Sequence, residues 1–190
     1  RYPARKLTVS LIPPDTGKTT TSTLTWNLLI IPDLKTALIS TVSAKIGHQD
    51  LPTGLHITSP NPWELQRLLR LIYNRGFKYV VIEVTSHGLD QYRLLGCNFK
   101  IGVITNVTHE HLDYHQTYDN YLKAKAKLFT GTKFNVLNKD DKSFLRLKKK
   151  ASGKIISYSL NQADFTLQKF RFKTKLLGDY NLSNCLAAIA

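Results

Sequence analysis

Short apolar runs alternate along the chain with longer stretches in which apolar residues recur every three or four positions. The first pattern is typical of buried β-strands and the second of helices that pack on one face. We expect strands at residues 7–12, 36–41, 79–84, 100–105, 133–137 and 154–159. We expect helices at residues 18–30, 62–75, 118–129, 142–150 and 181–190. Strands that alternate with helices predict an α/β fold, a mostly parallel sheet flanked by helices on both faces.

Two segments interrupt this alternation. Residues 42–60 contain Gly, Pro and polar residues and predict a long loop. Residues 164–174 alternate partly between apolar and polar positions, which predicts a half-exposed strand and so a small antiparallel element near the C-terminus. We find no internal repeat and no second apolar core, so the pattern predicts one domain over residues 1–190.

The composition narrows the class of protein. Hydrophobic residues make up 42% of the 190 residues and charged residues 21%, which is ordinary for a globular protein. No apolar run approaches the roughly 20 residues that cross a bilayer, so membrane insertion is not expected. Cys97 and Cys185 match neither a metal-ligand spacing nor a disulfide framework, which favours a reducing, cytoplasmic location.

The chain carries a strong excess of positive charge, formally +14 from 27 Lys and Arg against 13 Asp and Glu. Such an excess attracts polyanions, among them nucleotides, phosphorylated sugars and nucleic acid. Much of it lies at residues 148–150 and 169–175, where a solvated lysine-rich face is the simpler explanation. Because the sequence contains no recognisable nucleic-acid-binding module, nucleic acid is the least favoured of these partners.

A candidate phosphate-binding loop contains Gly17, Lys18, Thr19 and Thr20, where a predicted strand gives way to a predicted helix. A helix N-terminus offers free backbone N–H groups and the positive end of the helix dipole to a phosphate. In this context Lys18 would reach the outer phosphates of a nucleotide, and Thr19 would offer its hydroxyl to Mg²⁺. A helix that merely begins with this short sequence is the competing explanation.

Three further segments carry candidate chemistry. Glu83 lies near the end of the strand 79–84, where a carboxylate is a natural Mg²⁺ ligand, although a structural ion pair would also explain it. The loop 104–115 holds three histidines and two acids, which suits a metal site, including zinc, or a polar surface loop. Residues 121–129 carry lysines on a predicted helix and, from their pattern alone, predict a solvated basic face.

The order of these segments and the residues in them are similar to those of the Mur ligase family. From residue 7 to residue 190 the chain resembles the central, ATP-binding domain of that family. The stretches 83–93 and 105–115 are most similar to the tripeptide synthetase branch, which adds the third amino acid to the peptidoglycan precursor. The closing stretch 178–184 matches as well. The resemblance implies a P-loop NTPase-like fold, with ATP and Mg²⁺ as cofactors.

The resemblance also implies a reaction and a substrate. In the family, the carboxylate of a UDP-N-acetylmuramoyl-peptide attacks the γ-phosphate of ATP to form an acyl phosphate. An incoming amine then displaces phosphate and forms the amide. Catalysis of this kind is mostly positioning and charge neutralisation by lysine and Mg²⁺.

The resemblance assigns expected roles to matching positions. The residues implied in catalysis are Lys18, Glu83, His111 and Lys125. Those implied in Mg²⁺ binding are Thr19, Glu83, His111 and Lys125, the last as a carbamoylated lysine. Those implied in holding ATP, with the two asparagines at the adenine end, are Gly17, Lys18, Thr19, Thr20, Asn181 and Asn184. Those implied in holding the nucleotide-sugar substrate are Thr58, Ser59, Ser86, Gln91 and Arg93.

The sequence departs from the family pattern at two loops. Pro14, Asp15 and Thr16 replace the leading glycine and the Thr-Asn pair of the phosphate loop, and His109-Glu110 replaces the usual Arg-Asp. Proline has no N–H and aspartate adds a negative charge, and both oppose phosphate binding. The N-terminal and C-terminal domains of the family are not found in this sequence, so we expect full ligation to need a longer chain or a partner that supplies them.

Three alternatives stay open. A degenerate, non-catalytic relative that binds nucleotide, nucleotide-sugar or a partner protein would explain the altered loop. Another ATP-dependent amide ligase of the same superfamily, such as a folylpolyglutamate or cyanophycin synthetase, is less consistent with the wording of residues 86–89. A basic nucleic-acid-binding domain is the weakest of the three.

Overall fold

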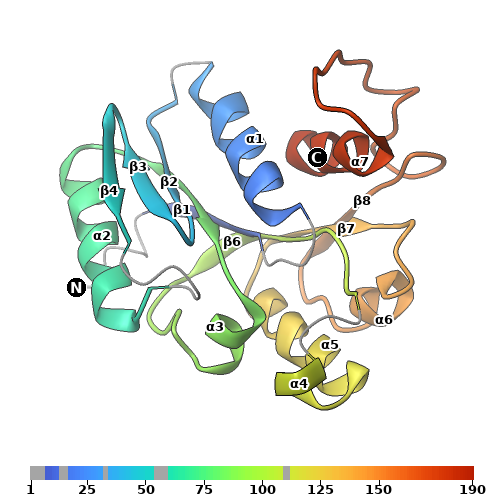
Figure 1. The fold of residues 1–190 in the computed structure, drawn as a ribbon, viewed down its shortest axis with the longest axis horizontal. Helices are drawn as coiled ribbons and strands as arrows, with labels where there is room; N and C mark the ends of the chain where they lie inside the picture. The colour runs from blue at the N-terminus through green and yellow to red at the C-terminus, as the bar shows by residue number, and fades with distance from the viewer. Residues whose placement is uncertain (1–6, 13–16, 32–33, 54–59, 109–111) are drawn as a thin grey trace.

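The computed structural model describes residues 7–12, 17–31, 34–53, 60–108 and 112–190. They form an eight-stranded sheet with helices on both faces (Figure 1). The strands are β1 Thr8–Ile12, β2 Thr36–Ile39, β3 Ser43–Ile46, β4 Gln49–Pro52, β5 Tyr79–Glu83, β6 Phe99–Ile104, β7 Phe134–Asn138 and β8 Lys154–Tyr158. The helices are α1 Lys18–Ile30, α2 Pro62–Asn74, α3 Ser86–Asp90, α4 Leu112–His115, α5 Tyr118–Ala126, the 3-10 turn η2 Lys127–Phe129, α6 Phe144–Lys148 and α7 Asp179–Ile189.

The sheet is mostly parallel, as the sequence predicts. Its strand order is β4-β3-β2-β5-β1-β6-β7-β8. All neighbouring strands from β2 to β8 are parallel, whereas β3 and β4 add an antiparallel hairpin at one edge. Since parallel strands end at the same edge of a sheet, the loops that follow β1, β2, β5, β6 and β7 meet there.

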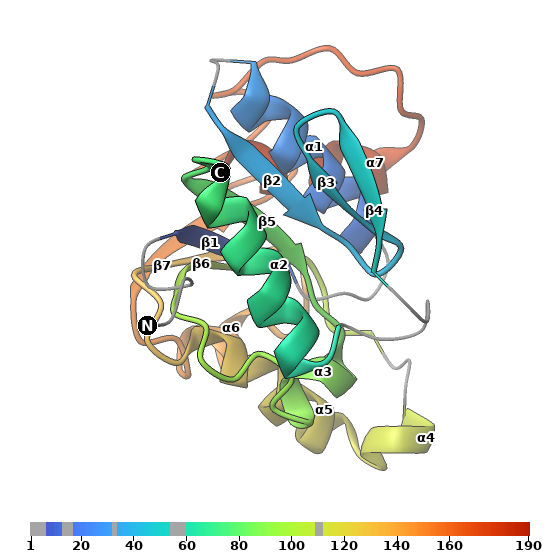
Figure 2. The same ribbon diagram turned by 90° about the vertical axis from the view of Figure 1, so that its left-hand side faces the viewer.

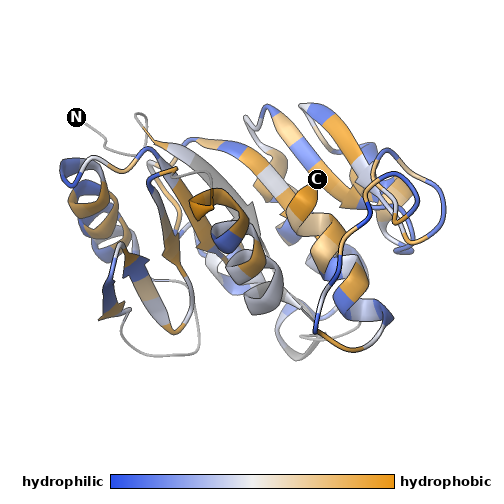
Figure 3. Cartoon of the chain, turned by 90° about the horizontal axis from the view of Figure 1, so that it is seen from above, coloured by the Kyte–Doolittle hydropathy of each residue, from blue (hydrophilic) through white to orange (hydrophobic). Residues whose placement is uncertain are grey.

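Successive residues of the parallel strands point into two different cores. In β5, Val80 and Ile82 join a core that contains the buried face of α2, and Val81 between them joins a core that contains Leu186 of α7. In Figure 2, α1 and α7 lie together on one side of the sheet, and α3, α5 and α6 lie on the other. Figure 3 marks the hydrophobic residues of the strands and of α7 in orange. Strands covered on both faces need continuous apolar runs, which explains the pattern that predicts them.

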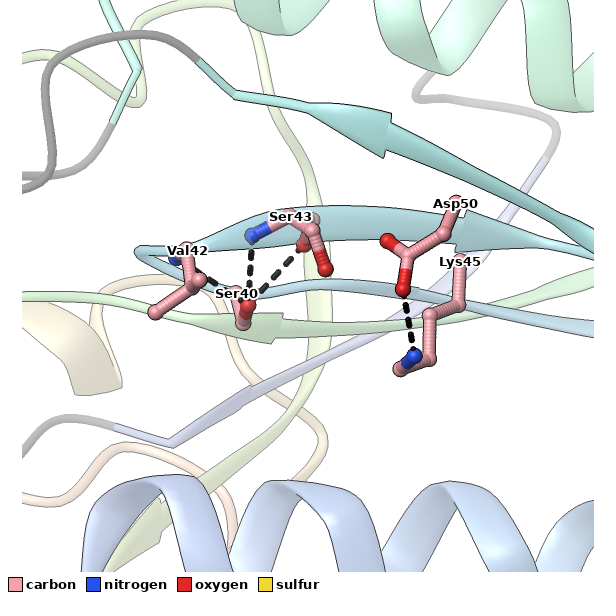
Figure 4. Close-up of polar contacts among 5 residues, drawn as sticks. All are labelled: Ser40, Val42, Ser43, Lys45 and Asp50. Carbon is pink, nitrogen blue, oxygen red and sulfur yellow. Dashed lines mark hydrogen bonds and ion pairs between the residues drawn. The ribbon is translucent and has the colours of Figure 1, made fainter.

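The loop predicted for residues 42–60 is wrong in its first part, because β3 and β4 form a hairpin there. In β3, Ala44 and Ile46 are buried and Lys45 between them is partly exposed. The Lys45 ammonium lies 2.7 Å from a carboxylate oxygen of Asp50 across the hairpin (Figure 4). The sequence does not reveal these strands because an alternation of four residues is too short to distinguish from a polar loop.

The turn from β2 into β3 is closed by Ser40. Its hydroxyl donates to the carbonyl oxygen of Ser43 at 2.9 Å and accepts from the N–H groups of Val42 and Ser43 at 3.2 and 3.0 Å (Figure 4). A serine side chain that bonds to the backbone in this way replaces turn hydrogen bonds that the backbone alone cannot make. The turn thereby fixes Thr41, which follows β2 at the carboxyl edge of the parallel strands.

The antiparallel strand predicted near the C-terminus, at residues 164–174, is not formed. This segment is made of turns and bends, and one isolated parallel bridge joins Phe165 to Tyr158 at the end of β8. The Asp164 carboxylate accepts from the N–H of Ser157 at 2.8 Å. Phe165 and Phe170 stack with their ring centroids 4.3 Å apart. The alternation reflects apolar side chains that pack against the end of the sheet, and the antiparallel pairs lie instead at the β3–β4 edge.

Local capping signals explain where several helices begin and end. The Asn61 side chain accepts from the N–H of Glu64 at 2.9 Å and begins α2, and Gly76 follows its end with a φ of 78°. The short helices α3 and α4 are not predicted, because four or five residues show no helical period. The Thr85 hydroxyl caps α3 by accepting from the N–H of Gly88 at 3.0 Å. No helix in the described part of the chain is long and apolar enough to cross a membrane.

Leu69 tests how much α2 depends on the core, since its side chain is fully buried. We expect Leu69→Ala to lower the free energy of unfolding by about 2–5 kcal/mol, because it leaves a cavity between helix and sheet. Trp63 lies on the same helix but is 87% exposed, so Trp63→Ala should change the free energy of unfolding by less than about 0.5 kcal/mol. Urea denaturation measures both, and similar losses for the two variants would contradict this packing.

Candidate functional site

The centre of the candidate site lies where β1 and β5 end side by side. The two strands are parallel neighbours, and Ile12 of β1 is in register with Glu83, the last residue of β5. The chain after β1 leads into α1, whose first turn carries Thr19. The Thr19 hydroxyl lies 3.3 Å from each carboxylate oxygen of Glu83. The fold therefore brings together two side chains that lie 64 positions apart and that the sequence predicts to share a metal ion.

Glu83 is completely buried, and its carboxylate accepts hydrogen bonds from hydroxyl groups of two different segments. Besides Thr19, the hydroxyl of Thr41 donates to it at 3.2 Å. Thr41 follows β2, the other parallel neighbour of β5, and the Ser40 turn fixes its place. Carboxylate and hydroxyl oxygens are the ligands that Mg²⁺ prefers, so the donor set fits a hard divalent cation.

The first turn of α1 begins at Gly17, which has a φ of 90° that L side chains rarely adopt. A Cβ at this position would also lie 2.7 Å from the side-chain nitrogen of Asn184 on α7. The backbone angle therefore favours glycine, and a Cβ at this position would also displace the side-chain amide of Asn184. Asn184 and Asn181, predicted to lie at the adenine end of ATP, are mostly buried beside this turn, and their contact with adenine stays a prediction.

Lys125 is fully buried, so the basic face predicted from the lysine pattern of residues 121–129 is wrong at this position. Its ammonium donates to the carbonyl oxygen of Asn106, just after β6, at 2.8 Å and lies 4.6 Å from the ring centroid of Tyr121. Lys123 on the same helix is exposed, as expected for a solvated face. A lysine is almost never fully buried unless it is paired, so Lys125 is distinguished from its neighbours by its environment.

Ser86 begins α3 and is buried against His115 at the end of α4. The Ser86 hydroxyl and the Nε2 atom of His115 lie within hydrogen-bond distance, at 3.2 Å. The imidazole stacks on Tyr121 with the ring centroids 4.9 Å apart, and the ring of Tyr114 meets it edge-on at 4.8 Å. His115 therefore faces Ser86, and the metal site predicted for the loop 104–115 stays a prediction because its other histidines lie outside the described residues. Within the described ranges, no three His, Cys, Asp or Glu side chains gather as a metal site.

Gln91 and Arg93, which the resemblance places with Ser86 on the substrate, lie at the far end of α3. The Arg93 Nε donates to the side-chain oxygen of Gln91 at 2.8 Å. Between them, Tyr92 has a φ of 54°, an unusual value for a bulky residue and a common sign of a functional constraint. The structure thus brings Gln91 and Arg93 together with each other, and Ser86 together with His115.

A pocket of about 470 Å³ opens beside this region, between the end of α3 and helices α4 and α5. Asp90 and Lys127 form an ion pair of 2.7 Å on its wall. The hydrogen bond from Lys127 holds the pKa of Asp90 below its ordinary value of 3.8, and the same bond raises the pKa of Lys127 above 10.5. The Lys127 ammonium also lies 4.7 Å from the ring centroid of Tyr92.

Some predicted residues lie outside the described part of the chain. These are Thr58, Ser59 and His111, together with the altered loop residues Pro14, Asp15, Thr16, His109 and Glu110. The backbone of Lys18 is described as the first residue of α1, but the position of its side chain is not.

The sequence interpretation missed residues that organise the same edge of the sheet. Thr41 is one, and the acid pair Asp140 and Asp141 after β7 is another. Asp140 accepts from the hydroxyl of Ser159 at 2.6 Å, and Asp141 accepts from the N–H of Val107 at 3.4 Å. They thereby connect the loops after β6, β7 and β8. Their place in the sequence could have identified them, since polar residues directly after parallel strands collect at the ligand-binding edge of the sheet.

The fold belongs to the P-loop-like class. Its sheet is mostly parallel, its central strand is followed by a helix that begins at a glycine, and the neighbouring strand ends in a buried carboxylate. The chain belongs to the Mur ligase family, because the family model described as the Mur ligase middle domain matches residues 16–190. This family comprises ATP-dependent ligases of peptidoglycan-precursor synthesis.

Individual relatives agree with this assignment. The chain is 34% identical to UDP-N-acetylmuramyl-tripeptide synthetase 2 of Oceanobacillus iheyensis, in an alignment that covers 100% of the chain and 44% of the relative. It is 36% identical to the UDP-N-acetylmuramoyl-L-alanyl-D-glutamate–2,6-diaminopimelate ligase of Aquifex aeolicus, covering 99% of the chain and 42% of the relative. The chain therefore spans a little over two fifths of the length of these relatives.

Solved structures give the same result. A UDP-N-acetylmuramoyl-L-alanyl-D-glutamate–2,6-diaminopimelate ligase matches with a TM-score of 0.86 and 31% identity, over 96% of the chain and 42% of that protein. MurF from Acinetobacter baumannii matches with a TM-score of 0.73 at 17% identity, over 98% of the chain and 42% of that protein. At this low identity the second match supports the fold alone.

The ion pair of Asp90 and Lys127 makes a pH-dependent contribution to stability. A carboxyl with a lowered folded-state pKa stabilises the protein above its unfolded pKa, and this stabilisation is lost as the pH falls through the folded value. We expect Asp90→Asn to lower the free energy of unfolding at pH 7 by less than about 1 kcal/mol, because both side chains are more than one third exposed. The difference from the wild type should shrink below pH 4. Denaturation at pH 7 and pH 3 measures it, and a difference of equal size at both values would contradict the pairing.

Proposed function

We propose that the chain is the ATP-binding central domain of a ligase that adds the third amino acid to UDP-N-acetylmuramoyl-dipeptide through an acyl phosphate. The observation that carries this proposal is the contact of Thr19 with the buried carboxylate of Glu83 at the N-terminus of α1. The names of the relatives from Oceanobacillus iheyensis and Aquifex aeolicus support the choice of reaction step. Flanking domains, in the same protein or a partner, would complete the enzyme.

In this proposal the phosphates of ATP lie at the first turn of α1. The backbone of residues 17–20 and the Lys18 side chain would bind them, helped by the positive end of the helix dipole. Thr19, Glu83, His111 and a carbamoylated Lys125 would hold Mg²⁺. The bound cation would neutralise the phosphate charge that the reaction moves. Burial of Glu83 strengthens its attraction for a cation, since water does not screen it.

The substrate would lie on the other side of this edge. Ser86, Gln91 and Arg93 of α3 and the turn after it would bind the nucleotide-sugar, together with Thr58 and Ser59. His115 holds the Ser86 hydroxyl in one place, and the Gln91–Arg93 hydrogen bond orders the guanidinium. Positioning of this kind is the main contribution that a protein makes to phosphoryl transfer.

Binding of Mg-ATP tests the proposal directly. We expect isothermal titration calorimetry to detect binding by the wild-type chain, and Glu83→Gln to weaken it at least about tenfold, or ~1.4 kcal/mol. The reason is that the amide keeps the shape of the side chain but removes the charge that attracts Mg²⁺. Asp119→Asn is the matched control, because Asp119 of α5 lies in an exposed ion pair with Arg146 of α6, and this variant should bind like the wild type. Absence of binding at millimolar ATP would overturn the proposed function.

A degenerate relative that no longer binds ATP is the second candidate, and the sequence of the phosphate loop favours it. Pro14 lacks an N–H, and Asp15 places a negative charge where phosphates would lie. If the wild-type chain fails to bind Mg-ATP but Pro14→Gly combined with Asp15→Thr binds it, the altered loop is the cause of the loss. Failure of both proteins would point to a partner other than ATP.

The carbamate on Lys125 is tested by matched variants on one helix. In ¹³C-bicarbonate, the amine nitrogen of Lys125 would bond to the carbon of carbon dioxide and release its proton to water. We expect a ¹³C NMR carbamate signal in the wild type and in Lys123→Arg, since Lys123 is exposed, but not in Lys125→Arg. A signal that persists in Lys125→Arg would assign the carbamate elsewhere.

A further inference from the structure

The side chain of Asn184 on α7 packs against the first turn of α1. Asn184 is 5% exposed, and its amide fills the space that a Cβ at Gly17 would need. Its side-chain oxygen also accepts from the hydroxyl of Thr21 at 3.2 Å, a residue with no exposed surface one turn into α1. One amide group therefore contacts both the start and the end of the first helical turn, whose backbone hydrogen bond from Thr21 to Gly17 measures 2.8 Å.

Asn184 is itself fixed by a short series of hydrogen bonds that runs along α7 to the residues before it. Its side-chain nitrogen donates to the side-chain oxygen of Asn181 at 3.4 Å. The side-chain nitrogen of Asn181 donates in turn to the carbonyl oxygen of Leu177 at 2.8 Å. Asn184 thus has its donor and its acceptor engaged on opposite sides, which fixes the orientation of the amide and so the side it presents to α1.

We propose that Asn184, held by Thr21, is a positioning residue that fixes the Gly17 turn in the conformation that binds phosphate. This role rests on the proposed ATP site, and it differs from the adenine contact expected for Asn184, because it acts at the phosphate end whatever base is attached. The backbone N–H groups at residues 17–20 have to point together at an anion, and a helix N-terminus binds anions only when they do. Pro14 contributes no N–H, so more of the binding depends on the helix side of the loop, the side that Asn184 holds.

Thr21 offers a test that leaves the proposed binding residues intact. Thr21→Val keeps the shape of the side chain and removes the hydroxyl, whereas Thr21→Ser keeps the hydroxyl and serves as the control. The ligands are Mg-ATP and Mg-tripolyphosphate, which has the phosphates but no base, and binding is measured by calorimetry. We expect Thr21→Val to lower the affinity for both ligands by the same factor of about five, the usual effect of one lost hydrogen bond. Thr21→Ser should stay within about twofold of the wild type.

Hydrogen exchange gives a second readout that needs no ligand. In Thr21→Val, the amides of residues 17–22 should exchange faster than in the wild type, while those in the strands of the sheet keep their rates. If Thr21→Val weakens ATP but leaves tripolyphosphate binding unchanged, the positioning role is overturned in favour of an adenine contact alone. Unchanged exchange at residues 17–22 would overturn it as well.

The same experiment separates this role from the proposed function. If the wild type binds neither ligand, the ATP site fails, and the exchange rates alone then decide whether Asn184 orders the turn. If the wild type binds both ligands and Thr21→Val behaves like Thr21→Ser, the ATP site stands and the positioning role fails.

Discussion

The buried carboxylate of Glu83 sets the constraint on which the site depends. Glu83 ends β5, which is paired with β1 on one side and with β2 on the other. Burying a charged group costs several kcal/mol unless it is paired and hydrogen-bonded. Donors therefore have to come from the segments that follow both neighbouring strands, and Thr19 in the first turn of α1 and Thr41 after β2 supply them. The left-handed Gly17 and the Ser40 turn are the local features that allow each loop to reach the carboxylate.

The two layers of helices contribute different parts of the site. On one face of the sheet, α1 and α7 form the proposed phosphate-binding part, where Asn184 packs against Gly17. On the other face, α3 and α5 bring in Ser86 and Lys125. Within the second part, the ring of Tyr121 connects these two residues, because it stacks on His115, which faces Ser86, and also contacts the Lys125 ammonium. The sheet edge is where both parts meet, as is usual for ligand sites in open parallel sheets.

Membership of the Mur ligase family favours ATP binding by this chain, whereas the sequence of the altered phosphate loop opposes it. Among the described residues for which the resemblance predicts metal binding, Thr19 contacts the buried carboxylate of Glu83, and Lys125 is buried. The departures are confined to the segments before α1 and before α4. Because backbone N–H groups contribute much of the phosphate binding in such loops, Pro14 in place of glycine would weaken the proposed phosphate binding without a change in the core of the domain.

The periodicity of apolar residues predicted most of the fold from sequence alone. Strands buried on both faces and helices packed on one face impose patterns that extend over many residues, so a few exceptions do not obscure them. It also located Glu83, since a carboxylate at the end of an apolar strand stands out. Periodicity failed where elements were too short, as in the β3–β4 hairpin, and where apolar alternation served packing rather than pairing, as in residues 164–174. The burial of Lys125, the Ser86–His115 contact and the approach of Asn184 to Gly17 were decided by tertiary structure, because each depends on segments that are distant in the chain and meet only when the sheet is assembled.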